Sequence, residues 1–91
     1  MTQIIKWLEA QGVGYSVNPH SITIMLEKDC VWINGFGEPM KWDRKIVIYK
    51  NPYKEYLAVE TVGYNMSEQL CWASKQSKVI EALQKRLRKE R

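Results

Sequence analysis

Residues 74–91 read Ser-Lys-Gln-Ser-Lys-Val-Ile-Glu-Ala-Leu-Gln-Lys-Arg-Leu-Arg-Lys-Glu-Arg, and this stretch is the clearest structural signal in the chain. At about 100° per residue, its apolar side chains share one arc of about 100° on a helical wheel with Trp72: Val79, Ile80, Leu83 and Leu87. A second arc on the far side holds Lys75, Lys78, Lys85, Arg86 and Lys89. The spacing predicts an amphipathic helix with one side on a core and the other carrying positive charge.

The segment before this helix, residues 64–73, leaves two alternatives open. Ser67, followed by Glu68 and Gln69, could cap a helix that continues to the C-terminus. Leu70, however, lies about 130° from the centre of the apolar arc, which favours a separate strand or a kink before Ser74. The sequence does not decide between one long helix and a strand followed by a helix.

The chain begins with the pattern of a short helix. Apolar side chains on one side of residues 3–11 predict it, Thr2 is its expected N-cap, and Gly12 ends it. A helix this short gains its stability from packing against the rest of the domain rather than from intrinsic propensity.

Between the two helices, the apolar residues repeat with a period of two, which is typical of strands. Proline and asparagine mark turns between the strands, because proline fixes φ and asparagine tolerates unusual backbone angles. Five strands are predicted, at residues 15–17, 21–27, 30–34, 45–50 and 55–62, with a turn at 28–29 and a loop at 35–41. Because no helix intervenes, the sheet is expected to be an antiparallel meander.

The predicted fold class is α+β. An antiparallel meander of about five strands is flanked by a short N-terminal helix and a longer, basic, amphipathic C-terminal helix, in one domain over residues 1–91. The composition, 45% hydrophobic and 26% charged, is that of a soluble globular protein. No apolar run approaches the roughly 20 residues that a membrane span requires. We therefore expect a cytoplasmic protein without membrane contact.

The net charge of +4 is concentrated in two blocks. Residues 41–54 hold five basic residues against one acidic, and residues 75–91 hold seven against two. Basic groups interleaved with aromatic rings suit nucleic acid, because charge follows the phosphates and rings stack on bases. The blocks predict a non-enzymatic module that binds DNA or RNA through Lys41, Trp42, Arg44, Lys45, Lys50, Tyr53, Lys54, Lys75, Lys78, Lys85, Arg86, Arg88 and Lys89. The competing explanation is a solvated helix face and lysines that protect an edge strand from aggregation.

An alternative function is that of a protein-interaction module, such as an inhibitor of a larger enzyme that handles nucleic acid. Phe36, between two glycines in the predicted loop, would be one anchor, with Trp42 and Tyr53 as others. A homodimer is compatible with either function. The two basic blocks form a single binding surface only if they lie on the same side of the fold.

Catalytic and metal sites find little support. The single imidazole, His20, neighbours Ser21, and side chains of neighbouring residues generally diverge rather than converge on a substrate. Cys30 and Cys71 form no CxxC pair and lack the histidines of a zinc site, so they are expected to be reduced thiols. We predict no catalytic residue, no metal ligand and no cofactor.

Overall fold

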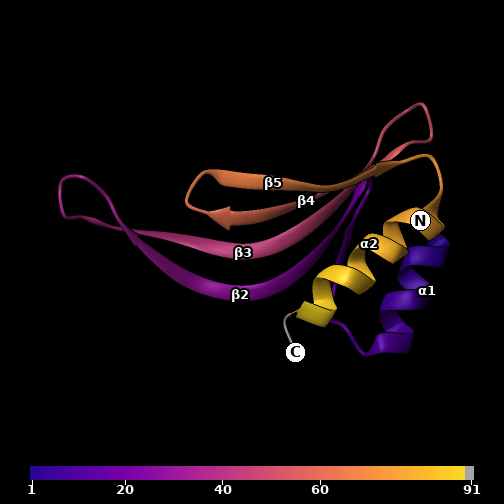
Figure 1. Cartoon of the computed structure of the whole chain (residues 1–91), viewed down its shortest axis with the longest axis horizontal. Coiled ribbons are helices and arrows are strands. Elements are labelled where there is room, and N and C mark those ends of the chain that lie inside the picture. The colour runs from indigo at the N-terminus through magenta and orange to yellow at the C-terminus, as the bar shows by residue number, and fades with distance from the viewer. Residues whose placement is uncertain (90–91) are drawn as a thin grey trace.

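The computed structural model describes residues 1–89 and contains two helices and five strands within that range. The elements in chain order are α1 (Thr2–Gln11), β1 (Ser16–Asn18), β2 (Ser21–Ile33), β3 (Pro39–Lys50), β4 (Tyr56–Gly63), β5 (Met66–Ala73) and α2 (Gln76–Lys89). Each strand is antiparallel to the next, in the order β1-β2-β3-β4-β5, and both helices lie on one face of the sheet (Figure 1). The predicted α+β fold class is confirmed. Glu90 and Arg91, the last residues of the predicted helix and of the second basic block, lie outside the described residues.

The second and third predicted strands are one continuous strand, β2. The pairing of β2 with β3 shifts register on both sides of Glu27, and Asp29 has a positive φ of 57°. These are features of β-bulges, in which extra residues on one strand bend it without ending it. The predicted turn at residues 28–29 is therefore wrong, because a bulge accepts the same polar residues as a turn.

The predicted loop at residues 35–41 is also shorter than expected. The Oδ1 atom of Asn34 accepts hydrogen bonds from the backbone N–H groups of Phe36 and Glu38, each at 2.9 Å, and Gly37 adopts a φ of 79°. This tight connection allows β3 to begin at Pro39, six residues before the predicted start.

Residues 66–73 form β5, so the alternative of a strand followed by a helix is correct.

The core lies between the helices and one face of the sheet, which we call the helix side. Strand alternation directs Ile22 and Ile24 of β2, Ile46 and Ile48 of β3, and Ala58 of β4 to this side, and each is at most 1% exposed. The helices contribute four fully buried side chains: Ile4, Leu8, Val79 and Leu83. The predicted apolar side of α2 therefore packs in the core. Trp72, which was expected to share that side, belongs to β5 instead.

The N-terminus of α1 is capped from α2. The predicted N-cap Thr2 is instead the first helical residue, and the preceding Met1 makes no side-chain cap. The Oε1 atom of Gln76 accepts hydrogen bonds from the backbone N–H groups of Gln3 at 3.0 Å and Ile4 at 3.1 Å. The first turn of each helix is thereby tied to the other.

Replacing Gln76 by alanine is expected to lower the free energy of unfolding by about 0.5–2 kcal/mol, the usual cost of losing a helix cap. Urea denaturation would measure the change. Gln84→Ala, at an exposed position of α2, is the matched control and should have an effect within about 0.5 kcal/mol. Equal effects of the two substitutions would contradict the capping role.

The two helices cover only part of the sheet. The chain is 44 Å long in its longest dimension, and the β2–β3 hairpin projects well beyond the helices (Figure 1). We call residues 30–42, the projecting end of this hairpin, the arm. At the other end of the sheet lie the β1–β2 turn, the β3–β4 turn and the connection from β5 to α2.

Candidate functional site

The face of the sheet away from the helices, which we call the open face, is not covered by any element among residues 1–89. Because β3 pairs regularly from Lys50 to Pro39, Lys45, Val47 and Tyr49 alternate with the core isoleucines and lie on this face. The register of the neighbouring strands adds Ser16, Asn18, Ser21, Thr23, Met25, Leu57, Val59, Thr61, Ser67, Gln69 and Trp72.

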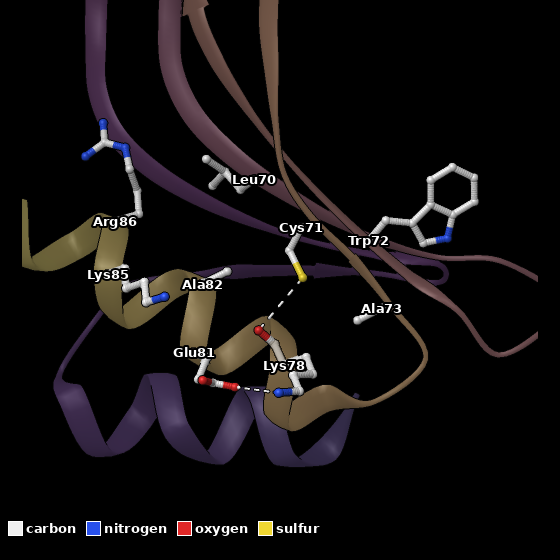
Figure 2. Close-up of a pocket in the computed structure, with 9 residues that line it drawn as sticks. All are labelled: Leu70, Cys71, Trp72, Ala73, Lys78, Glu81, Ala82, Lys85 and Arg86. Carbon is white, nitrogen blue, oxygen red and sulfur yellow. Dashed lines mark hydrogen bonds and ion pairs between the residues drawn. The ribbon is translucent and has the colours of Figure 1, made fainter.

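An aromatic row crosses the open face on three adjacent strands. Tyr49 of β3 pairs with Leu57 of β4, and Leu57 pairs with Trp72 of β5. Tyr49 is 48% exposed and Trp72 is 60% exposed, which is a large apolar surface to leave in water. The three side chains border a cavity of about 130 Å³ at the end of the sheet. Figure 2 shows the Trp72 ring pointing away from α2.

The charge on the open face is mixed. The same alternation along β3 places Asp43 on this face beside Lys45, with Lys41 beyond it on the arm, and the Oδ1 atom of Asp43 accepts a hydrogen bond from the backbone N–H of Asp29 at 3.1 Å. Three lysines surround the nearby end of the sheet: Lys50 at the end of β3, Lys54 in the β3–β4 turn, and Lys75 between β5 and α2. We call these three the basic end. They bring part of the first basic block beside part of the second.

Two arginines of the predicted binding set lie instead against a buried carboxylate. Glu60 of β4 is 2% exposed on the helix side, and Arg44 Nε donates to its Oε2 at 3.2 Å. Arg86 Nη2 donates to Oε2 at 2.7 Å, and Arg86 Nε donates to Oε1. The Arg86 hydrogen bond, more than any other contact, holds the pKa of Glu60 below its ordinary value, although burial opposes this shift. On the helical wheel Arg86 is at the edge of the basic arc, only about 20° from Val79, so it borders the apolar side and can reach the buried Glu60 carboxylate.

The remaining cations of α2 are divided between its two flanks. Lys78 and Lys85 line a groove of about 520 Å³ between α2 and β5 (Figure 2), whereas Arg88 lines a smaller cavity beside α1. Within the groove, Lys78 forms an ion pair of 3.4 Å with Glu81. The predicted basic side of α2 is thus partly neutralised and faces away from the open face. The side chain of Lys89 lies outside what the structure describes.

The same groove contains Cys71, whose Sγ donates a hydrogen bond to the carbonyl oxygen of Lys78 at 3.8 Å (Figure 2). Burial raises the pKa of this thiol, and the nearby Glu81 carboxylate raises it further, with Lys78 opposing. Because the thiolate is the reactive form, Cys71 should be a slow nucleophile at neutral pH.

In a Cys30→Ser variant, alkylation therefore reports on Cys71 alone, and we expect it to be several-fold slower in the folded protein than in urea at pH 8. Mass spectrometry after timed exposure to iodoacetamide would measure the rate. Equal rates in the folded and unfolded protein would contradict the buried, raised-pKa thiol.

The other predicted aromatic residues do not converge. Trp42 lies on the helix side of the arm and is half-buried. Tyr53 is 84% exposed in the β3–β4 turn, and Phe36 is 89% exposed at the tip of the arm, the opposite end of the molecule. The three therefore do not form one surface. Lys41 also lies on the arm, away from the basic end.

Sequence reasoning missed Tyr49 and Trp72 as exposed aromatics. Tyr49 was assigned to the strand and Trp72 to the apolar side of the helix. The available signal was the run Ile46-Val47-Ile48-Tyr49, in which both alternating sets are apolar, so that a second face of the sheet must carry apolar residues.

Within residues 1–89, no three His, Cys, Asp or Glu side chains gather closely enough to hold a metal ion. None of the helices in this part of the chain has the length and apolar character needed to cross a membrane. His20 is exposed in the β1–β2 turn.

Comparisons with protein-family models, with curated proteins and with solved structures find no match to this chain.

Proposed function

We propose that this protein is a small non-enzymatic module that binds single-stranded nucleic acid on the open face of its sheet. One observation carries the proposal: exposed Tyr49 and Trp72 share an uncovered face with Lys45, next to the basic end. The binding surface differs from the one expected from the sequence, since α2 lies on the other side of the sheet.

The arrangement favours unpaired bases over a duplex. An exposed ring on a flat sheet offers a stacking partner to any base, and each such contact is worth roughly 1–3 kcal/mol. Bases in a duplex are already stacked on one another and present only their edges. Tyr49 and Trp72 are separated by one strand, so their backbones are about 10 Å apart, which leaves room for a base on each ring.

The lysines would neutralise phosphates. Lys45 lies on the open face, and Lys50, Lys54 and Lys75 lie at the end of the aromatic row. Each phosphate neutralised on a single strand contributes a slope of about −0.7 to the dependence of log affinity on log salt concentration. Four contacts therefore predict a slope of about −3.

Fluorescence anisotropy with labelled single- and double-stranded oligonucleotides of the same sequence, as DNA and as RNA, tests the proposal. We expect tighter binding to single strands and weakening with added salt. Changing Lys50, Lys54 and Lys75 together to alanine should weaken binding further and flatten the salt dependence. Lys85→Ala with Arg88→Ala on α2 removes two charges from the other side of the sheet and is the control.

Failure to bind any single strand at low salt, or equal binding to the duplex, would overturn the proposal. A stoichiometric protein complex formed through Tyr49 and Trp72 in place of nucleic-acid binding would support the alternative, that of a protein-interaction module. The partner would then be a protein, and replacing Tyr49 and Trp72 by alanine would abolish its capture.

A further inference from the structure

A cavity of about 640 Å³ lies at the end of the sheet opposite the arm, between two turns. The β1–β2 turn and the β3–β4 turn form its walls, and the backbone N–H of Lys50 joins them by donating a hydrogen bond to the carbonyl oxygen of His20 at 3.0 Å. The volume lies within the range of about 300–1,000 Å³ that is usual for pockets that hold a small molecule. We call this cavity the turn pocket. Its lining residues are Pro19, His20, Lys50, Asn51, Pro52 and Lys54.

The β3–β4 wall of the turn pocket is held in one conformation by Asn51. The Oδ1 atom of Asn51 accepts hydrogen bonds from the backbone N–H groups of Tyr53 and Glu55, each at 2.9 Å, and its Nδ2 atom donates to Glu55 Oε1 at 3.1 Å. Lys54 adopts a positive φ of 62°, and its backbone N–H donates to the carbonyl oxygen of Asn51 at 3.2 Å. The backbone of Lys54 is therefore placed by a hydrogen-bonded turn.

The turn pocket carries positive charge that no carboxylate neutralises. Lys50 and Lys54 line it together with the imidazole of His20, and none of the lining residues is acidic. Among residues 1–89, neither lysine forms an ion pair. Glu55, on the same turn, lines the neighbouring cavity instead. Two cations in one pocket repel each other, and a bound anion would offset that repulsion.

The turn pocket is continuous with the aromatic row. The cavity that Tyr49, Leu57 and Trp72 border also has Lys50 and Asn51 in its lining, and both of these residues line the turn pocket. A single strand stacked on the aromatic row can therefore reach the pocket along the surface. Because the pocket lies at the end of the sheet, it is in position to receive one end of that strand.

The charge of the turn pocket suits a phosphate monoester better than the diester of an internal linkage. A diester carries one negative charge, whereas a monoester carries about −1.5 to −2 at neutral pH and has three oxygen atoms that accept hydrogen bonds. The ammonium groups of Lys50 and Lys54 match such a dianion, and His20 can donate a ring N–H in either protonation state.

We propose that the turn pocket binds the phosphate monoester at one end of a single strand whose adjoining bases stack on Tyr49 and Trp72. Lys50 and Lys54 neutralise the dianion, and His20 donates a hydrogen bond to it. Such end recognition rests on the proposed single-strand binding and makes it specific for a phosphorylated end.

Anisotropy titrations test the proposal with three strands of one sequence that carry an internal fluorophore and a phosphate on the 5′ end, on the 3′ end or on neither. At fixed pH and low salt, we expect one of the phosphorylated strands to bind at least about fivefold more tightly than the unphosphorylated strand. His20→Ala and Lys54→Gln should each reduce this preference, and the double variant should abolish it. Thermal unfolding checks that these variants are folded.

Lys75→Gln is the matched control, because it removes the same charge from the basic end outside the turn pocket. It should weaken the binding of all three strands and leave the ratio of their affinities unchanged. A preference for the phosphorylated strand that survives in the double variant would overturn the assignment of the phosphate to the turn pocket.

Equal affinity for the three strands, with the preference for single strands over duplexes intact, would overturn end recognition alone. Absence of binding to every strand would overturn both end recognition and the proposed function. A nucleoside monophosphate that competes as effectively as the phosphorylated strand would assign the pocket to a free nucleotide and overturn the proposal, since a mononucleotide can occupy at most one of the two rings.

Discussion

Replacing Glu60 by alanine is expected to lower the free energy of unfolding by about 3–5 kcal/mol. The carboxylate is almost completely buried and accepts hydrogen bonds from Arg44 and Arg86, and the Arg86 side chain is itself only 14% exposed. Removing the carboxylate leaves positive charge in a poorly solvated place and takes away the contact that joins α2 to β3 and β4. Small domains have about 5–15 kcal/mol of stability in total, so the variant should be close to unfolding. Urea denaturation at neutral pH would measure the change.

Glu68→Ala is the control for this substitution. Glu68 pairs with Glu60 on the neighbouring strand but is exposed, so its loss should change the free energy of unfolding by less than about 0.5 kcal/mol. Exchanging Arg44, Glu60 and Arg86 together for apolar residues of similar volume should restore much of the stability, because the charges at this place are then all removed together. A Glu60→Ala variant as stable as the Glu68→Ala control would contradict the role of the buried carboxylate.

The contribution of Glu60 should also depend on pH. Its pKa is lowered in the folded protein, chiefly by the Arg86 hydrogen bond, so the unfolded chain takes up a proton at a higher pH than the folded chain does. The stabilisation is therefore fully present above the ordinary glutamate pKa of about 4.3 and is lost as the pH falls through the folded-state pKa. The difference in stability between wild type and Glu60→Gln should shrink over that acidic range. A difference that stays constant would contradict the lowered pKa.

The fold class was predictable because local patterns and tertiary packing agree. The 3.6-residue period in residues 76–89 places Val79 and Leu83 on one side, and the core occupies that side. The period of two in β3 and β4 likewise matches a sheet with a buried face. The errors fall where pairing between strands overrides local signals. Polar residues 28–29 have the composition of a turn. They lie instead within β2, which keeps pairing with β3 on both sides of them, so they form part of a bulge.

The candidate site was less predictable for the same reason. Whether a cation is exposed depends on a residue far away in the sequence: Arg86 turns inward because Glu60 of β4 lies beneath it. Whether an aromatic ring is exposed depends on which face of the sheet is covered, and residues 64–73 had to be assigned as a strand before Trp72 could be placed. Composition predicted an excess of rings and cations, but only the register shows which of them share a face.

Replacing Tyr49 and Trp72 together by alanine is expected to have the largest effect on the proposed binding. Each ring that stacks on a base contributes roughly 1–3 kcal/mol, so each single variant should lose about 5- to 150-fold in affinity for a single strand, and the double variant about 30-fold at least. Because both rings are exposed, their loss removes little of the core. Anisotropy titrations with a single-stranded oligonucleotide would measure the affinities, and a quenching of tryptophan fluorescence on binding that is lost in a Trp72→Phe variant would report the stacking.

The control for this double variant is Phe36→Ala, which removes an aromatic ring that is 89% exposed at the tip of the arm, at the opposite end of the molecule. It should leave the affinity for a single strand unchanged, since Phe36 is not on the open face. The lysines remain in the double variant, so residual binding should be weak, equally strong for single strands and duplexes, and removed by salt. Full affinity in the double variant, or an equal loss in Phe36→Ala, would place the binding surface elsewhere on the protein.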